Sequence, residues 1–128
     1  MKFLLDTHAL LWLIDNDPRV SATVISLYLN TDNQRYFSTA SIWEIAIKVS
    51  IGKLKIKDTL ERFVDEHIWR NAIDILPIKT THLYQIPNLQ HYHRDPFDRL
   101  LISQCLDEKI PILSADTILD KYGVRRIW

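Results

Sequence analysis

Short apolar runs alternate along the chain with longer segments in which apolar residues recur at helical spacing. The short runs predict β-strands at residues 3–5, 35–37, 73–78, 112–113 and 124–127. The first run, Phe3 to Leu5, is apolar at consecutive positions, which is typical of a strand covered on both faces. This alternation of strands and helical segments favours an α/β fold with a parallel sheet.

The longer segments predict helices at residues 7–14, 24–29, 40–51, 60–68, 96–108 and 117–122. Gly52 directly follows the third of these, and Asp95 with Pro96 opens the fifth, as expected for helix ends. Pro77 makes the third strand the least regular one. Residues 79–94 predict one short helix and a loop rich in His, Tyr and Pro.

Composition restricts the protein class. The 128 residues are 47% hydrophobic and 25% charged, which indicates one globular domain over residues 1–128 and excludes a disordered tail. The single cysteine, Cys105, suits a reducing compartment. The charges of sixteen basic and sixteen acidic residues cancel, so nucleic-acid binding requires local basic patches. No stretch reaches the roughly 18 apolar residues of a membrane span, so we expect a cytoplasmic protein without membrane contact.

Four acidic residues fall at junctions between strands and helices. Asp6 and Asp116 follow predicted strands, whereas Glu44 and Asp98 lie in the first turns of helices. Because parallel strands end at a common edge, we expect the four carboxylates to share one crevice. Two carboxylates about 4 Å apart repel by on the order of 4 kcal/mol at an effective dielectric near 20, and a hard divalent cation relieves this repulsion. Oxygen ligands without an accompanying Cys favour Mg²⁺ or Mn²⁺ over zinc.

The same acids have a purely structural interpretation. Asp6, Asp116 and the nearby Asp95 are suitable helix N-caps, and Asp98 in a first turn interacts favourably with the helix dipole. Glu44 has Lys48 four residues further on, a favourable spacing for an ion pair on a helix. Taken singly, each acid is explained by these local roles, and only the shared edge of the sheet favours a common site.

Four motifs resemble, in order, those of the PIN domain, and most closely those of VapC-type ribonuclease toxins of bacterial toxin–antitoxin pairs. They are Leu4-Leu5-Asp6-Thr7-His8, Ser41-Ile42-Trp43-Glu44-Ile45-Ala46-Ile47-Lys48, Asp95-Pro96-Phe97-Asp98-Arg99-Leu100-Leu101-Ile102 and Ser114-Ala115-Asp116. The resemblance spans essentially the whole chain. It implies a PIN-like three-layer fold with a five-stranded parallel sheet in the order 3-2-1-4-5 and helices on both faces.

The resemblance also implies Mg²⁺-dependent endonucleolytic cleavage of RNA, with Mn²⁺ as a substitute. Asp6, Glu44 and Asp98 match the three core acids, and Asp116 matches the more variable fourth. In this interpretation Asp6 and Asp98 hold metal, Glu44 completes the shell or orients the water, and Asp116 serves a second metal or its waters. One ion and two ions are both compatible with these acids. A homodimer and a small antitoxin protein covering the crevice are implied as well.

Further residues near the motifs are candidates for support or substrate contact: Thr7, Ser114, Asp95, Arg99, His93 and Arg94. Ser114 stands where many PIN domains have threonine, a hydroxyl in either case. His93 and Arg94 lead into the acidic helix and either contact phosphate or form an ordinary polar loop. Arg99 either guides a phosphate or makes a surface ion pair.

Two other functions suit a chain of this length. A receiver-like phosphoacceptor domain requires two adjacent acids after the first strand, whereas Asp6 is followed by Thr7 and His8. A catalytically inactive PIN-like RNA-binding or scaffold module is the second alternative. Such modules usually lack one or more core acids, and all four positions are acidic here.

Overall fold

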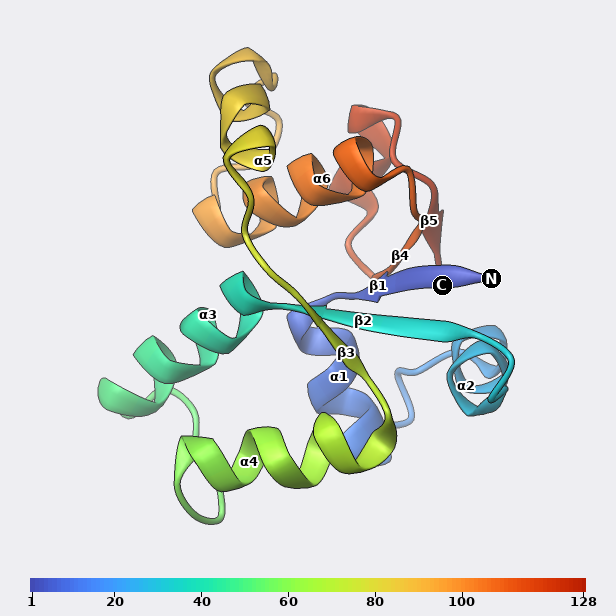
Figure 1. Cartoon of the computed structure of the whole chain (residues 1–128), viewed down its shortest axis with the longest axis vertical. Helices are drawn as coiled ribbons and strands as arrows, with labels where there is room; N and C mark the ends of the chain where they lie inside the picture. The colour runs from blue at the N-terminus through green and yellow to red at the C-terminus, as the bar shows by residue number, and fades with distance from the viewer.

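A five-stranded sheet forms the centre of the computed structural model, which describes all 128 residues (Figure 1). Its strands are β1 (Lys2–Leu5), β2 (Gln34–Ser38), β3 (Asp74–Leu76), β4 (Ile112–Leu113) and β5 (Arg126–Ile127). All neighbouring strands are parallel, in the order β3-β2-β1-β4-β5. The predicted α/β class and the strand order 3-2-1-4-5 are confirmed.

Helices connect the strands. The α-helices are α1 (Thr7–Ile14), α2 (Ala22–Leu29), α3 (Thr39–Ser50), α4 (Leu60–His67), α5 (Thr80–Gln85) and α6 (Pro96–Glu108), and the 3₁₀ helices are η1 (Trp69–Asn71), η2 (Ile86–Asn88) and η3 (Thr117–Tyr122). The predicted helices agree to within two residues, except that residues 117–122 are 3₁₀ rather than α. The third and fifth strands are shorter than expected. Pro77 lacks the N–H needed to extend β3, and β5 pairs only with the two-residue β4.

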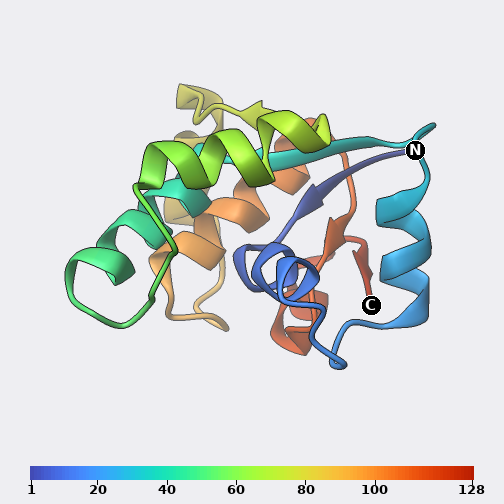
Figure 2. The same cartoon turned by 90° about the horizontal axis from the view of Figure 1, so that it is seen from below.

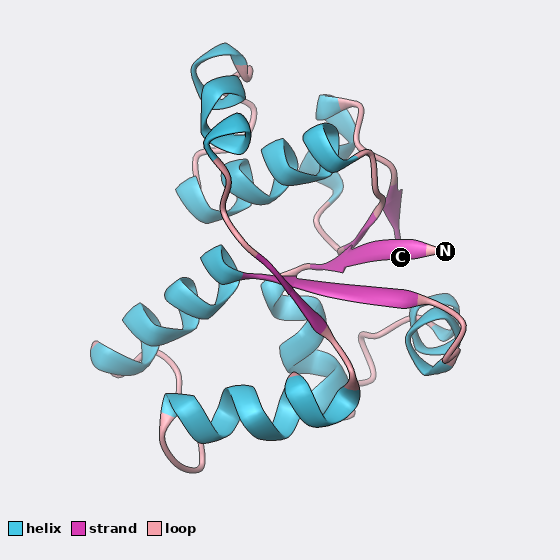
Figure 3. Cartoon of the chain, viewed as in Figure 1, coloured by secondary structure: helices cyan, strands magenta, loops and turns pink.

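Successive residues of β1 contribute to two cores on opposite faces of the sheet. Phe3 and Leu5 pack in one core with buried residues of α1, α2, α3 and α4. Leu4 packs in the other with residues of α6, including Cys105, which is buried as expected. Figure 3 shows helices on both sides of the strands, and Figure 2 shows α1 and α4 in front of the sheet when it is seen from below. The expected three layers are therefore present.

The carboxyl ends of the central strands lie side by side. Leu5 of β1 is paired with Phe37 of β2 and with Leu113 of β4. Helix α1 begins two residues after Leu5, and α3 follows β2 without a break. α3 also packs against both α1 and α6, so several helix N-termini gather at this edge. None of the helices combines the length and the apolar run needed to cross a bilayer.

Candidate active site

Asp6 lies at the end of β1 with only 6% of its surface exposed. Its Oδ2 accepts a hydrogen bond of 2.6 Å from Ser114 Oγ, and its Oδ1 is buried without any hydrogen-bond partner. The residue occupies the N-cap position of α1, yet its side chain makes no capping bond. Burial raises the pKa of the Asp6 carboxyl above its ordinary value, in part countered by the bond from Ser114. The unpartnered oxygen fits a cation ligand better than a cap.

Glu44 is the second buried acid, with 4% exposure, on the first half of α3. Its Oε2 lies 2.9 Å from Lys48 Nζ, so the ion pair expected from the i,i+4 spacing is present. Its Oε1 is buried and has no hydrogen-bond partner. Lys48 therefore satisfies only one of the two carboxylate oxygens, and the other remains free to accept a ligand.

Asp98 lies in the first turn of α6, beside the other acids. Burial raises the pKa of Asp98 to about 8, and the charges of Asp6, Asp95, Glu44 and Asp116 contribute to the same shift. Both burial and the nearby negative charges make ionisation of this carboxyl unfavourable. The structure thus brings the four predicted acids, which come from four separate segments of the chain, to one edge of the sheet.

Asp116 and Asp95 both cap helices, as their positions suggested. Asp116 Oδ1 accepts from the backbone N–H of Ile118 at the start of η3. Asp95 Oδ1 accepts from the N–H groups of Phe97 and Asp98 at the start of α6. The second oxygen of Asp116 takes part in the cluster, because His93 Nε2 lies 2.7 Å from Asp116 Oδ2.

Two hydroxyl groups brace the site from within. Ser114 Oγ holds Asp6 and also accepts the backbone N–H of Asp116, so one side chain joins two of the acids. Thr7 is buried and donates to Ser41 Oγ at 2.8 Å, which ties the start of α1 to α3. Ser41 opens the second of the four motifs, but the sequence indicates no role for it at the site, because its contact with Thr7 is made only in the fold.

Two of the acids, Asp6 and Asp116, line a cavity of about 330 Å³ together with His8, Ala9, Trp12 and Ala115. His8 was not predicted as a site residue, although it belongs to the first motif; its proximity lowers the pKa of Asp6 somewhat against the effect of burial. Its position as the second residue of α1, two residues after Asp6, was the only feature of the sequence that could have indicated this contact. A second cavity, of about 490 Å³, is lined by His93 and the exposed Arg94 together with Trp43 and His91.

Arg99 is a correction. The expectation of a surface ion pair is wrong, because the residue is 8% exposed and its guanidinium contacts backbone carbonyl groups instead. Nη1 donates to Gln90 O at 2.8 Å, and Nη2 donates to Ile86 O and Leu89 O at 3.3 Å each. Its side chain therefore holds the loop that precedes α6, and it also lines a cavity shared with Trp43 and Arg94.

Residues 3–124 match the PIN domain family. The chain belongs to this family. The matched region includes all four acids at the edge of the sheet. No curated protein matches this PIN domain in sequence.

Several solved structures share this fold. The PIN domain matches VapBC2 from Rickettsia felis bound to a DNA fragment from their promoter, with a TM-score of 0.72 and 16% identity over 99% of this chain and 98% of that chain. It matches VapBC-1 from nontypeable Haemophilus influenzae with a TM-score of 0.72 and 14% identity over 99% and 97%. It matches FitAcB from Neisseria gonorrhoeae with a TM-score of 0.68 and 15% identity over 98% of this chain and 96% of that chain. At these identities the likeness establishes a shared fold.

Proposed function

We propose that this PIN domain is a metal-dependent endoribonuclease and the toxin of a toxin–antitoxin pair. The observation that carries the proposal is the pair of buried, unpartnered oxygens, Asp6 Oδ1 and Glu44 Oε1, beside Asp98 with its raised pKa. Buried polar atoms are normally hydrogen-bonded, so two free acceptors in one acidic site favour an ion as the missing partner. An all-oxygen set favours Mg²⁺ or Mn²⁺.

The residues of the site would have separate roles in binding the metal ion. Asp6, Glu44 and Asp98 would hold the ion. A divalent ion in such a site neutralises charge on the scissile phosphate and lowers the pKa of the attacking water. Ser114 fixes the rotamer of Asp6, and Lys48 fixes that of Glu44, so both free oxygens are oriented in advance.

Single-stranded RNA is the substrate that best suits the surroundings of the acids. The cavity that contains Arg94 and His91 also has the ring of Trp43, which is 57% exposed. A cation beside an exposed aromatic ring suits a phosphate next to an unpaired base. Trp43 lies on α3, which also carries Glu44, and His91 and Arg94 lie on the loop that leads into α6, the helix that carries Asp98.

Cleavage assays test the proposed activity. The purified chain is expected to cut diverse structured RNAs internally in the presence of Mn²⁺ or Mg²⁺, and to stop when EDTA is added, because the carboxylates alone supply no electrophile. Denaturing gels of end-labelled RNA measure this. RNA binding without cleavage under all metal conditions would instead support the inactive RNA-binding module.

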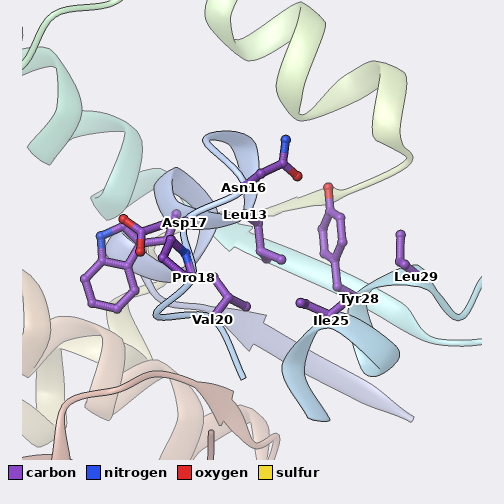
Figure 4. A pocket seen from close by; sticks show the side chains of 9 residues that line it. Leu13, Asn16, Asp17, Pro18, Val20, Ile25, Tyr28 and Leu29 are labelled. Carbon is purple, nitrogen blue, oxygen red and sulfur yellow. The ribbon is translucent and has the colours of Figure 1, made fainter. Parts of the chain in front are cut away.

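The proposed antitoxin needs a surface on this chain, and an apolar groove between α1 and α2 fits it. The groove has a volume of about 370 Å³ and is lined by Trp12, Leu13, Asn16, Asp17, Pro18, Val20, Ile25, Tyr28 and Leu29 (Figure 4). Leu29 is 66% exposed and Ile25 is 41% exposed. Exposed apolar side chains grouped in a groove are typical of a protein interaction site. The VapBC and FitAcB structures named above support a two-component assembly.

The homodimer implied by the sequence resemblance stays a prediction. Sedimentation of the purified chain measures its oligomeric state.

Ile25→Asp tests the groove. Burying a new charge against an apolar partner is expected to weaken antitoxin binding at least about 10-fold, because an unpaired charge is costly to desolvate. The antitoxin is recovered by purifying the chain from its native host, and its addition is expected to block RNA cleavage. Ser26→Asp is the matched control, since Ser26 is exposed on the same helix but does not line the groove. Equal inhibition of both variants would place the antitoxin elsewhere.

A further inference from the structure

We infer that His93 fills the position between Asp98 and Asp116 that a second metal ion would need, so that the site binds one divalent ion. This inference rests on the proposed metal-dependent function. His93 Nε2 lies 2.7 Å from Asp116 Oδ2 and 3.2 Å from Asp98 Oδ2. Two-metal nucleases hold their ions about 3.5–4 Å apart through shared carboxylates. Here a single ring nitrogen already joins two of the four acids.

The hydrogen bonds of the ring decide what His93 offers to these acids. The backbone N–H of Asp95 donates to His93 Nδ1 at 3.1 Å. An N–H group can only donate, so Nδ1 must be the unprotonated nitrogen of the ring, and Nε2 must carry the proton. A protonated Nε2 is a hydrogen-bond donor and has no lone pair for a metal. Histidine ligands have the reverse arrangement, in which the second nitrogen donates to a carbonyl or carboxylate. His93 therefore replaces a cation and does not bind one.

The backbone on both sides keeps the ring in this position. The N–H of His93 donates to Tyr122 Oη at 2.7 Å, and the Tyr122 hydroxyl donates to Gln90 O at 2.6 Å. Arg99, which is buried, contacts the carbonyl groups of Gln90 and His93. The His93 side chain is only 11% exposed. Its placement follows from the folding of the loop onto α6 and η3, and a metal ion would have to disturb these contacts to displace it.

The acceptors left without a donor lie on the other acids. Asp6 Oδ1 and Glu44 Oε1 are buried and unpartnered, whereas Asp98 Oδ2 and Asp116 Oδ2 both have the Nε2–H of His93 within reach. The site is thus divided into a part that needs a cation and a part that His93 already satisfies. We place the single ion with Asp6, Glu44 and the remaining oxygen of Asp98.

Counting bound ions tests the inference without measuring activity. Mn²⁺ binding is followed by calorimetry and by loss of the free-ion EPR signal. The wild-type chain is expected to bind one Mn²⁺, and His93→Ala is expected to bind a second, weaker one because Asp98 and Asp116 lose their donor. His91→Ala, which removes an exposed histidine two residues away, is the matched control and is expected to bind one. Circular dichroism checks the folding of each variant.

A second measurement needs no variant. Long-range ¹⁵N NMR of the wild-type ring reports which nitrogen is protonated, and the proton is expected to stay on Nε2 when Mg²⁺ saturates the chain. Two ions in the wild-type chain, a metal-induced change of the His93 tautomer, or a single ion in folded His93→Ala would each overturn the inference. A wild-type chain that binds no divalent ion would instead overturn the proposed metal-dependent function.

Discussion

Asp98→Asn is expected to reduce RNA cleavage by more than about 100-fold, because substitution of a residue that only supports a metal ligand already costs roughly 10–100-fold in affinity or activity. Asp98 is placed as a ligand itself. The amide has nearly the shape of the carboxylate but carries no charge, so the loss would reflect electrostatics rather than packing. Metal-dependent cleavage of a labelled RNA measures it, with Mn²⁺ binding as the parallel readout.

The same substitution is expected to stabilise the metal-free protein. The pKa of Asp98 is about 8 in the folded chain against an ordinary value of 3.8, so the folded state retains a proton that the unfolded state has released. Stability of the metal-free chain should therefore fall as pH rises from about 4 to about 8, and stay low above that range. The loss is on the order of 6 kcal/mol, since the shift from 3.8 to about 8 is roughly four pKa units and each unit corresponds to about 1.4 kcal/mol.

Urea unfolding at pH 5 and pH 8 in EDTA measures this pH dependence and the stability of the variant without metal. Asp98→Asn should show a smaller pH dependence, which Asp6 with its own raised pKa still supplies, and should exceed the wild type in stability at pH 8. Added Mn²⁺ should stabilise the wild type at pH 8 but not the variant. Asp32→Asn is the control, because Asp32 is exposed in the turn before β2, at the opposite edge of the sheet. A variant that cleaves RNA within a few-fold of wild type would remove Asp98 from the metal site.

The helices and strands could be predicted from the sequence because their signals are local and repeated. Consecutive apolar residues such as Phe3, Leu4 and Leu5 need cover on both faces, and both cores exist. Asp95 with Pro96 marked the start of α6 to the residue. The order of the strands came from the family resemblance and not from these signals, since pairing between distant strands has no local signature. The 3₁₀ form of residues 117–122 was missed because a short apolar segment after an N-cap is compatible with either helix type.

The acids could be predicted because they stand next to strand ends, where the sheet fixes their position. The contacts of His93 and Arg99 could not be predicted, since both depend on how the loop before α6 folds back. An arginine next to an active-site aspartate is read most simply as a charge near the surface. In the structure, Arg99 is buried by the residues of η2 and by Gln90, whose carbonyl groups no sequence pattern reveals.

Arg99→Ala is expected to destabilise the protein by about 3 kcal/mol or more, because each buried carbonyl group that loses its only donor costs about 1–3 kcal/mol. The carbonyl groups of Gln90, Ile86 and Leu89 would each lose a donor. Arg99→Lys should recover only part of the loss, since a single ammonium group cannot reach the carbonyls that the two guanidinium nitrogens contact.

Thermal and urea unfolding in EDTA measure the effect of Arg99→Ala, and Arg94→Ala is the matched control. Arg94 is exposed in the same loop, so its truncation should change stability by less than about 0.5 kcal/mol. A stability of Arg99→Ala within that limit would show that the carbonyl contacts are replaced by water at no cost. A large loss would instead show that a buried cation, placed among carbonyl groups with no carboxylate partner, stabilises the loop that holds His93 against Asp98 and Asp116.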